Sequence, residues 1–337
     1  MSKTRLAVVG CGGMSKAHLR RFETLSDRLE LVAAVDVLAE RAQVVADEMP
    51  GVRVATDYRD VLDDVDAVLL VLPHHLHHPI GMDCLAAGKH VLLEKPMALD
   101  EAECVDLIRA SREADRVLMV AYCMRFHPLV VRLKELIDDK ALGDVFQVSI
   151  WTEQLTRYAD DHWAMDPAKL GGGQLFSHGC HYIDLLLWYL GRPVRGIHLG
   201  TNTGTPWMGR EGTSNVSMEF EDGILGYHFG TWGARGTRLR YSFHAHCTEG
   251  MIEADITGGR LLSIVKGEET VLLEAESGKH TENEMAHFLD CIQTGATPLT
   301  DGPGSLQGLR AIWRMYAAEE KGEVADLRGL GLDQVEV

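Results

Sequence analysis

The regular alternation of short apolar runs with amphipathic stretches over the first 120 residues constrains the fold most. The apolar runs are Arg5–Val9, Leu29–Asp36, Ala67–Leu72, His90–Leu93 and Val117–Val120. The amphipathic stretches between them are Gly13–Leu25, Ala39–Glu48, Pro79–Ala87 and Glu101–Ala114. This order is typical of a parallel sheet covered by helices, and it predicts a doubly wound α/β domain of six strands, five of which are the runs named above.

A glycine-rich turn follows the first predicted strand and opens the first predicted helix. It reads Gly10-Cys11-Gly12-Gly13-Met14-Ser15. Glycines at such a turn let backbone N–H groups approach a pyrophosphate, and Ser in the third glycine position is still small enough for helix–strand packing. We therefore expect Gly10, Gly12, Gly13 and Met14 to contact a dinucleotide.

Asp36 ends the second predicted strand. A carboxylate at this place accepts hydrogen bonds from the adenine-ribose hydroxyls and repels a 2′-phosphate, so it predicts NAD rather than NADP. The alternative is a solvated N-cap of the helix that follows, since Asp is a favoured capping residue.

From about Gly143 the pattern changes to longer runs of β-branched and aromatic residues, which predict a large, mostly antiparallel sheet. The runs are Val145–Trp151, Asn215–Phe220, Ile224–Trp232 and Leu239–Cys247, and the helices expected beside them are His181–Leu190, Asn283–Thr294 and Ser305–Lys321. We expect a dinucleotide-binding domain over residues 1–124 and an α+β substrate-binding and oligomerisation domain over residues 125–337.

Composition excludes several classes of function. The chain has 33 basic and 50 acidic residues and a formal charge of −17, which disfavours nucleic acid as a partner. It contains no apolar run near the length that spans a bilayer, and its N-terminus lacks the anatomy of a signal peptide. The seven cysteines are spread singly, as in reduced cytoplasmic proteins. We expect a cytoplasmic protein that binds neither nucleic acid nor membrane.

Four further segments, in this order, resemble the glucose–fructose oxidoreductase and inositol dehydrogenase family, called Gfo/Idh/MocA. They are Leu72–Pro79 (LPHHLHHP), Ala87–Pro96 (AGKHVLLEKP), Met124–Phe126 (MRF), and the glycines Gly171–Gly173 followed by Gly179-x-His181-x-x-Asp184. The resemblance implies an NAD-dependent oxidoreductase with a Rossmann domain and a mixed-sheet C-terminal domain. It also implies a sugar, cyclitol or related polyol as substrate, and a homodimer or homotetramer formed through the open face of the C-terminal sheet.

Lys95 and His181 are the catalytic candidates. Taking a hydride from a secondary alcohol requires a base for the hydroxyl proton. Lys95 follows the predicted strand His90–Leu93, at the sheet edge where ligands bind, and the resemblance implies contacts to the substrate hydroxyl and the nicotinamide ribose. The resemblance also implies that His181 helps to carry the proton, with Asp184 one turn away either orienting it or serving the structure. The alternatives are a surface lysine in a turn and a packed or capping histidine.

The chain departs from the family pattern at Ser177. Many relatives have Asp at this position, four residues before the histidine, and Ser supplies no negative charge. The proton relay or the substrate contact must therefore differ, and His178 is a candidate substitute.

The remaining candidates line a cofactor wall or a substrate pocket. The segment Leu72–Pro79 contains four histidines, His74, His75, His77 and His78. A zinc site at these histidines is the less favoured interpretation, because carboxylate or cysteine partners are not evident nearby, and we expect no metal. On the cofactor side we expect Leu72, Pro73, His74, His77 and Glu94. On the substrate side, where ordinary interdomain loop residues are the alternative, we expect Lys95, Tyr122, Arg125, Arg157, Trp163, Ser177, His178 and His181.

These observations predict a dehydrogenase with net turnover of NAD. Two alternatives stay open: a glycoside hydrolase or isomerase that retains NAD and uses transient oxidation, and a non-catalytic sensor that binds NAD.

Overall fold

The computed structural model describes residues 3–334 and divides into two compact units. The first unit contains the chain up to Cys123 together with Lys279–Gly302, and the second contains Met124–Gly278 and the chain from Pro303 onward. Residues 279–302, which the sequence pattern places in the C-terminal domain, thus pack with the N-terminal unit. The last three residues of the range 125–337 lie outside the described residues.

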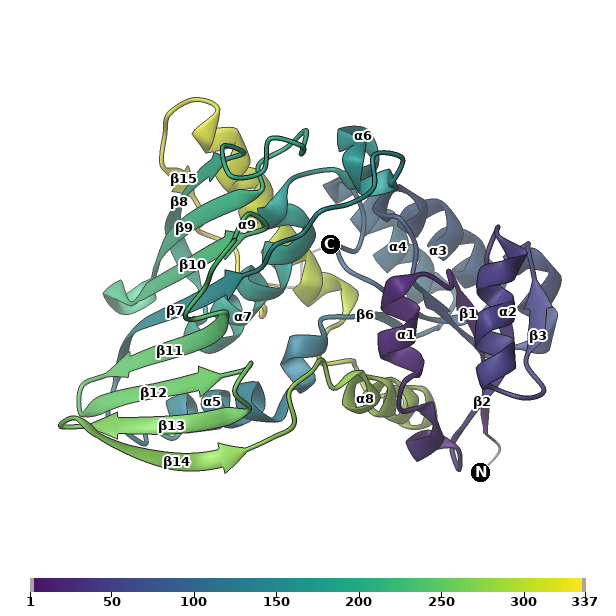
Figure 1. Ribbon diagram of the computed structural model, residues 1–337, viewed down its shortest axis with the longest axis horizontal. Helices are drawn as coiled ribbons and strands as arrows, with labels where there is room; N and C mark the ends of the chain where they lie inside the picture. Colours follow the sequence, from purple (N-terminus) through teal and green to yellow (C-terminus); the bar gives the residue numbers. More distant parts are fainter. Residues whose placement is uncertain (1–2, 335–337) are drawn as a thin grey trace. The chain divides into compact units, whose positions relative to one another are not determined.

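The first unit is built on a parallel six-stranded sheet with the order β3-β2-β1-β4-β5-β6, which confirms the predicted doubly wound fold (Figure 1). Its strands are β1 (Thr4–Val9), β2 (Leu29–Val35), β3 (Arg53–Ala55), β4 (Ala67–Leu70), β5 (His90–Leu93) and β6 (Leu118–Val120). Strands β1 and β4 are buried almost throughout, which is why they read as unbroken apolar runs. The edge strand β3 has three residues and begins with an exposed arginine, so it left no such run.

Helices connect these strands. They are α1 (Gly13–Leu19), α2 (Ala39–Glu48), α3 (His77–Ala86) and α4 (Glu101–Glu113), with short 3-10 turns η1 (Phe22–Leu25), η2 (Tyr58–Asp64) and η3 (His74–Leu76). All five strand pairs are parallel, so the carboxyl ends of the strands, and the residues that follow them, share one edge of the sheet.

Helix α8 (Thr281–Thr294) joins the first unit although it comes late in the chain. Two contacts fix its first turn to α1 and the residues just after it. Thr281 Oγ1 donates to the carbonyl of Ala17 at 2.8 Å, and Arg21 forms an ion pair with Glu282 at 2.6 Å. Nothing in the local pattern of this helix distinguishes it from a helix of the second unit, so the sequence could not assign it.

The second unit is built on a nine-stranded sheet with the order β14-β13-β12-β11-β7-β10-β9-β8-β15. The strands are β7 (Val145–Glu153), β8 (Pro193–Thr201), β9 (Thr213–Phe220), β10 (Leu225–Thr231), β11 (Tyr241–Cys247), β12 (Gly250–Asp255), β13 (Arg260–Val265), β14 (Glu268–Glu274) and β15 (Ala325–Asp326). Only the central pair β7–β10 is parallel among these pairings, which confirms the prediction of a mostly antiparallel sheet.

One face of this sheet is covered by helices. The helical elements of the unit are η4 (Cys123–Phe126), α5 (Pro128–Asp138), η5 (Trp163–Met165), α6 (Pro167–Leu170), the π-helical turn η6 (Leu175–Gly179), α7 (Cys180–Leu190), η7 (Glu221–Gly223) and α9 (Gly302–Glu319). Nearly every residue of α7 is buried, as its apolar sequence predicts, and the helix ends at Gly191 with φ of +83°. No helix of residues 3–334 combines the length and the apolar character that crossing a bilayer requires.

The opposite face of the sheet carries exposed apolar side chains. Ile197 and Leu199 alternate along β8 with the buried Gly196 and His198, so these two aliphatic side chains point away from the helices. Leu225 of β10, which pairs with Gln147, is a further large exposed side chain of this face.

Candidate active site

The glycine turn after β1 leaves open space where a dinucleotide phosphate would lie. A Cβ at Gly10 would meet the carbonyl oxygen of Val71 at 2.1 Å, and Gly10 has φ of +94°, so this glycine serves the turn itself. The Cβ positions of Gly12 and Gly13, by contrast, have no other atom within 4 Å. The turn therefore fits a group that approaches the backbone closely, as a pyrophosphate does.

Asp36 lies directly after β2 and holds the glycine turn. Its Oδ2 accepts a hydrogen bond from Cys11 N at 2.9 Å, and its Oδ1 accepts one from Leu38 N at 3.0 Å. The N-cap of α2 is Leu38, so Asp36 does not cap that helix in the expected way. Each carboxylate oxygen has a second lone pair that is not used by these bonds and suits a ribose hydroxyl.

Lys95 follows β5 at the carboxyl edge of the parallel sheet, and the ring of His77 braces its loop. His77 Nδ1 lies 2.7 Å from the carbonyl oxygen of Pro96, and Nε2 lies 2.9 Å from that of Leu72. Burial lowers the pKa of His77, so the ring is neutral and donates through one nitrogen at a time. Because His77 is fully buried, it supports the cofactor-side loops from behind.

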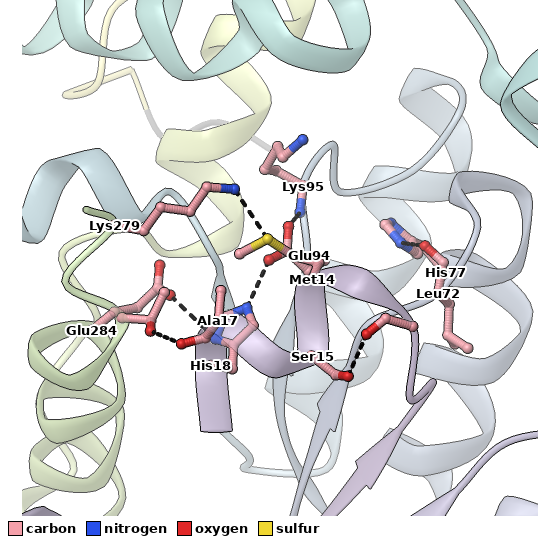
Figure 2. Close-up of polar contacts among 12 residues, drawn as sticks. Met14, Ser15, Ala17, His18, Leu72, His77, Glu94, Lys95, Lys279 and Glu284 are labelled. Atoms are coloured by element: carbon pink, nitrogen blue, oxygen red, sulfur yellow. Dashed lines mark hydrogen bonds and ion pairs between the residues drawn. The ribbon is translucent and has the colours of Figure 1, made fainter. Parts of the chain in front are cut away.

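The other cofactor-side candidates lie at the same edge. Leu72 and Pro73 are half-buried after β4, whereas His74 is buried and its ring centroid lies 5.7 Å from that of His77. Glu94 is buried, and its carboxylate binds the ring of His18 at 2.7 Å (Figure 2). Met14 of the glycine turn lies 3.0 Å from the ammonium of Lys279, measured to the sulfur atom.

In the second unit, His181 stands in the first turn of α7, directly after a π-helical turn that carries Ser177 and His178. Ser177 and His181 are buried, while His178 is half-buried. The rings of His178 and His181 lie edge to face with centroids 6.3 Å apart. The structure thus brings these three predicted residues together, and π-helical turns are frequent at functional sites.

One residue that sequence reasoning missed contacts His178, and a second contacts that residue. His178 Nε2 lies 3.2 Å from the hydroxyl of Tyr241, which in turn donates to Gln154 Oε1 at 2.6 Å. These residues belong to the start of β11 and the end of β7. Only the pairing of those strands reveals their proximity, so a local motif could not have shown it.

A buried clamp holds the turn before α7. The Tyr316 hydroxyl donates to Glu211 Oε1 at 2.5 Å and accepts from Gly173 N at 3.3 Å and Phe176 N at 3.2 Å. Leu175 N also donates to Glu211 Oε1 at 3.3 Å. Burial raises the pKa of Glu211, and the hydrogen bonds from the Tyr316 hydroxyl and the Leu175 N–H act in the opposite direction. The clamp fixes the N-terminal end of the segment that carries His178 and His181.

Arg125 and Asp184 form a buried ion pair. Arg125 Nε donates to Asp184 Oδ2 at 2.7 Å and Nη2 donates to Oδ1 at 3.3 Å, while the guanidinium lies over the Trp188 ring at 4.5 Å. Burial raises the pKa of Asp184. These contacts engage the side chain of Arg125, which we expected to meet substrate, and they show that Asp184 pairs with Arg125.

The last predicted substrate residues have different surroundings. Tyr122 is fully buried at the end of the first unit's sheet. Arg157 is exposed and lies 5.3 Å from the Trp207 ring centroid, and Trp163 packs against a small apolar core that includes Trp232. Within residues 3–334 no cluster of three or more His, Cys, Asp or Glu side chains has the arrangement of a metal site.

Comparisons with known proteins agree with this architecture. Residues 4–122 match the model of the Gfo/Idh/MocA oxidoreductase family with an NAD-binding Rossmann fold, and residues 130–253 match the C-terminal domain of the same family. Inositol 2-dehydrogenase of Mycolicibacterium smegmatis is 35% identical over 329 residues, which cover 92% of this chain and 91% of that protein. D-xylose 1-dehydrogenase (NADP(+)) 2 of Haloferax volcanii is 28% identical over 295 residues, which cover 85% of this chain and 89% of that protein.

The solved structures agree as well. Aldose-aldose oxidoreductase from Caulobacter crescentus, complexed with glycerol, superposes with a TM-score of 0.85 at 25% identity, covering 96% of this chain and all of the other. The family's relatives act as dehydrogenases on sugars and cyclitols. This chain therefore belongs to the Gfo/Idh/MocA family of NAD(P)-dependent oxidoreductases.

Proposed function

We propose that this protein transfers a hydride between NAD and a secondary alcohol of a sugar, cyclitol or related polyol. The observation that carries the proposal is the place of Lys95 at the carboxyl edge of the parallel sheet, on a loop braced by the buried His77. When bound, the nicotinamide accepts or supplies the hydride. Lys95 takes the proton of the substrate hydroxyl through its Nζ as the carbonyl forms, and returns it in the reverse direction.

His181 and His178 are proposed as the second part of the proton path. Ser177 provides no carboxylate, so the imidazole of His178, held by the Tyr241 hydroxyl, supplies a titratable group one turn before His181. Because the guanidinium of Arg125 is already paired with Asp184, the substrate side of the proposal rests on His178, His181, Arg157 and Trp163.

We propose NAD as the cofactor, on the strength of the Asp36 carboxylate at the ribose end of the glycine turn. We also propose that the protein acts in the cytoplasm, where seven buried cysteines would stay reduced. The apolar face of the nine-stranded sheet supports a homodimer or homotetramer formed through that face.

A substrate panel tests the proposal. The protein is mixed with NAD or NADP and with myo-inositol, D-xylose, glycerol and other sugars, and the reduced cofactor is followed by absorbance. We expect stoichiometric NADH from at least one polyol or sugar, which separates a dehydrogenase from an enzyme that retains NAD through transient oxidation. NAD binding without turnover of any member of the panel would favour a sensor.

The variant that tests Lys95 as the base is Lys95→Met, which removes the amine and keeps an unbranched side chain of similar length. We expect turnover to fall by about 10²–10⁴-fold, because general acid–base groups contribute that much, with NAD affinity nearly unchanged. Near-normal turnover of the best substrate by this variant would contradict the mechanism.

A further inference from the structure

A lysine from late in the chain lies beside the glycine turn of the first unit. Lys279 belongs to this unit, and its ammonium is 3.0 Å from the sulfur of Met14, although 265 positions separate the two residues (Figure 2). Met14 directly follows Gly12 and Gly13, the two positions where an added Cβ would have no other atom within 4 Å. A positive charge is therefore placed next to the part of the turn that fits a pyrophosphate.

The backbone next to Lys279 is held against α1. Thr281 Oγ1, two residues further along the chain, donates to the carbonyl of Ala17 at 2.8 Å. Between them, His280 adopts the left-handed conformation with φ of +48°. Residues other than glycine adopt this conformation rarely, and such positions are frequent where a chain holds a ligand. The position of Lys279 beside the glycine turn thus follows from contacts of its neighbours with the first helix.

The ammonium of Lys279 has only a weak partner. Within residues 3–334 it forms no ion pair, and the thioether of Met14 is its hydrogen-bond partner. The charge of Lys279 reaches the buried Glu94 and Glu284, but neither carboxyl forms an ion pair with it. A thioether accepts a hydrogen bond weakly, whereas an ammonium has three donors. Since Lys279 is exposed, most of its hydrogen-bonding capacity is available to water or to a ligand.

The charge of the expected cofactor favours a cation at this place. The pyrophosphate of a dinucleotide is a dianion, and the chain itself carries a formal charge of −17. Asp36 directly follows β2 and Glu94 directly follows β5, so carboxylates lie at the same edge of the sheet. Binding an anion there requires local positive charge. Lysine meets this need without the fixed geometry of arginine, because it binds phosphate as a point charge on a flexible stem.

We propose that Lys279 is a cofactor-binding residue whose ammonium pairs with the pyrophosphate of the bound dinucleotide. The inference rests on the proposed function, because NAD is the cofactor proposed there, and it adds a residue that lies in none of the sequence motifs. On binding, the ammonium exchanges the thioether of Met14 for a phosphate oxygen. Both side chains are unbranched and can change rotamer to allow this exchange.

Calorimetric titration without substrate tests the inference. The full-length protein, Lys279→Met and Lys279→Arg are titrated with NAD and with ADP-ribose, which has the pyrophosphate but no nicotinamide. We expect Lys279→Met to raise the dissociation constants of both ligands by about 10-fold, because a hydrogen bond between charged groups is lost. Lys279→Arg keeps the charge and should retain most of the affinity. Since the side chain is exposed, thermal unfolding of both variants should match that of the parent.

Ionic strength provides a second measurement. Salt screens the attraction between an exposed ammonium and a phosphate, and the screening length falls to about 3 Å at 1 M salt. The difference in NAD affinity between the parent and Lys279→Met should therefore shrink as sodium chloride is added. A difference that is independent of salt would contradict a charge pair.

The matched control is Lys16→Met, which removes the same charge from an exposed position of α1, two residues after Met14. It should leave both dissociation constants close to those of the parent. Equal weakening in Lys16→Met and Lys279→Met would show a general attraction of anions, and the inference would be wrong. Weaker binding of NAD with unchanged ADP-ribose in Lys279→Met would contradict the assignment to the pyrophosphate. If the parent forms NADH from a polyol and Lys279→Met binds both ligands as the parent does, the proposed function is supported and only this inference is wrong.

Discussion

At the scale of single residues, Asp36 holds the glycine turn in addition to the ribose binding that the sequence predicts for it. Its carboxylate is the group proposed to bind the ribose, and it also accepts hydrogen bonds from the backbone of the glycine turn at Cys11 and from Leu38. Replacing Asp36 by Ala would therefore loosen the turn as well as remove a charge. The informative change is Asp36→Asn, because the amide oxygen still accepts from Cys11 while the charge is lost.

We expect Asp36→Asn to narrow the preference for NAD over NADP by about 10-fold or more, equivalent to about 1.4 kcal/mol, because repulsion of the 2′-phosphate disappears. Asp36→Ala should in addition weaken the binding of NAD, because the glycine turn loses its hydrogen bonds to the carboxylate. Dissociation constants of both cofactors for the parent and the two variants provide the measurement. Tighter binding of NADP than NAD by the parent protein would show that Asp36 does not select the cofactor.

At the scale of elements, the clamp of Tyr316 and Glu211 joins α9 to the turn before α7. Tyr316→Phe removes the hydroxyl that bonds Glu211, Gly173 and Phe176, and it leaves a buried carboxyl short of a partner. We expect a loss of about 1–3 kcal/mol in the free energy of unfolding and faster amide hydrogen exchange over residues 171–180.

The control for this variant is Tyr227→Phe, which removes one hydroxyl bond, to Asn215 on the other face of the sheet. It should leave exchange over residues 171–180 at the parent rate. Parent-like exchange in Tyr316→Phe would mean that the clamp does not hold the segment of His178 and His181.

The elements that were predicted from sequence are those whose pattern is local. Strand β5 and helix α2 have the expected bounds, because a fully buried parallel strand and an amphipathic helix each carry their own periodicity. The short edge strand β3 and the polar, exposed strand β14 have no such signal. The sequence predicted helix α8 but not the unit to which it belongs, because the contacts that fix it come from α1 and the residues just after it.

The candidate site follows the same rule at the scale of the whole chain. Lys95, His181 and the glycine turn lie in short motifs, so they were predicted, and their catalytic roles stay predictions. Tyr241 and Lys279 lie in no motif, and only tertiary contacts bring them to His178 and Met14. The sequence also does not show which charged side chains are buried as pairs. The residues around Arg125 gave no sign that its guanidinium pairs with the carboxylate of Asp184.

The proposed homo-oligomer forms through the open face of the nine-stranded sheet. Leu199 is 64% exposed and Leu225 is 52% exposed, and on the same face Trp151 packs between Tyr227 and Phe229 with ring centroids 5.5 and 5.4 Å apart. A face this apolar is poorly suited to water, and a second copy of the chain would cover it.

The double variant Leu199→Glu with Leu225→Glu should therefore dissociate the oligomer. Burying a leucine contributes about 1.5–3 kcal/mol, and an unpaired carboxylate in the interface adds a further cost, so we expect the dissociation constant to rise by at least about 100-fold. Light scattering after size-exclusion chromatography measures the mass directly. Leu299→Glu is the control, because Leu299 is 42% exposed but belongs to the first unit and is no part of the nine-stranded sheet. If the parent and the double variant have the same mass, the open face is not the interface, and the apolar side chains on it need another explanation.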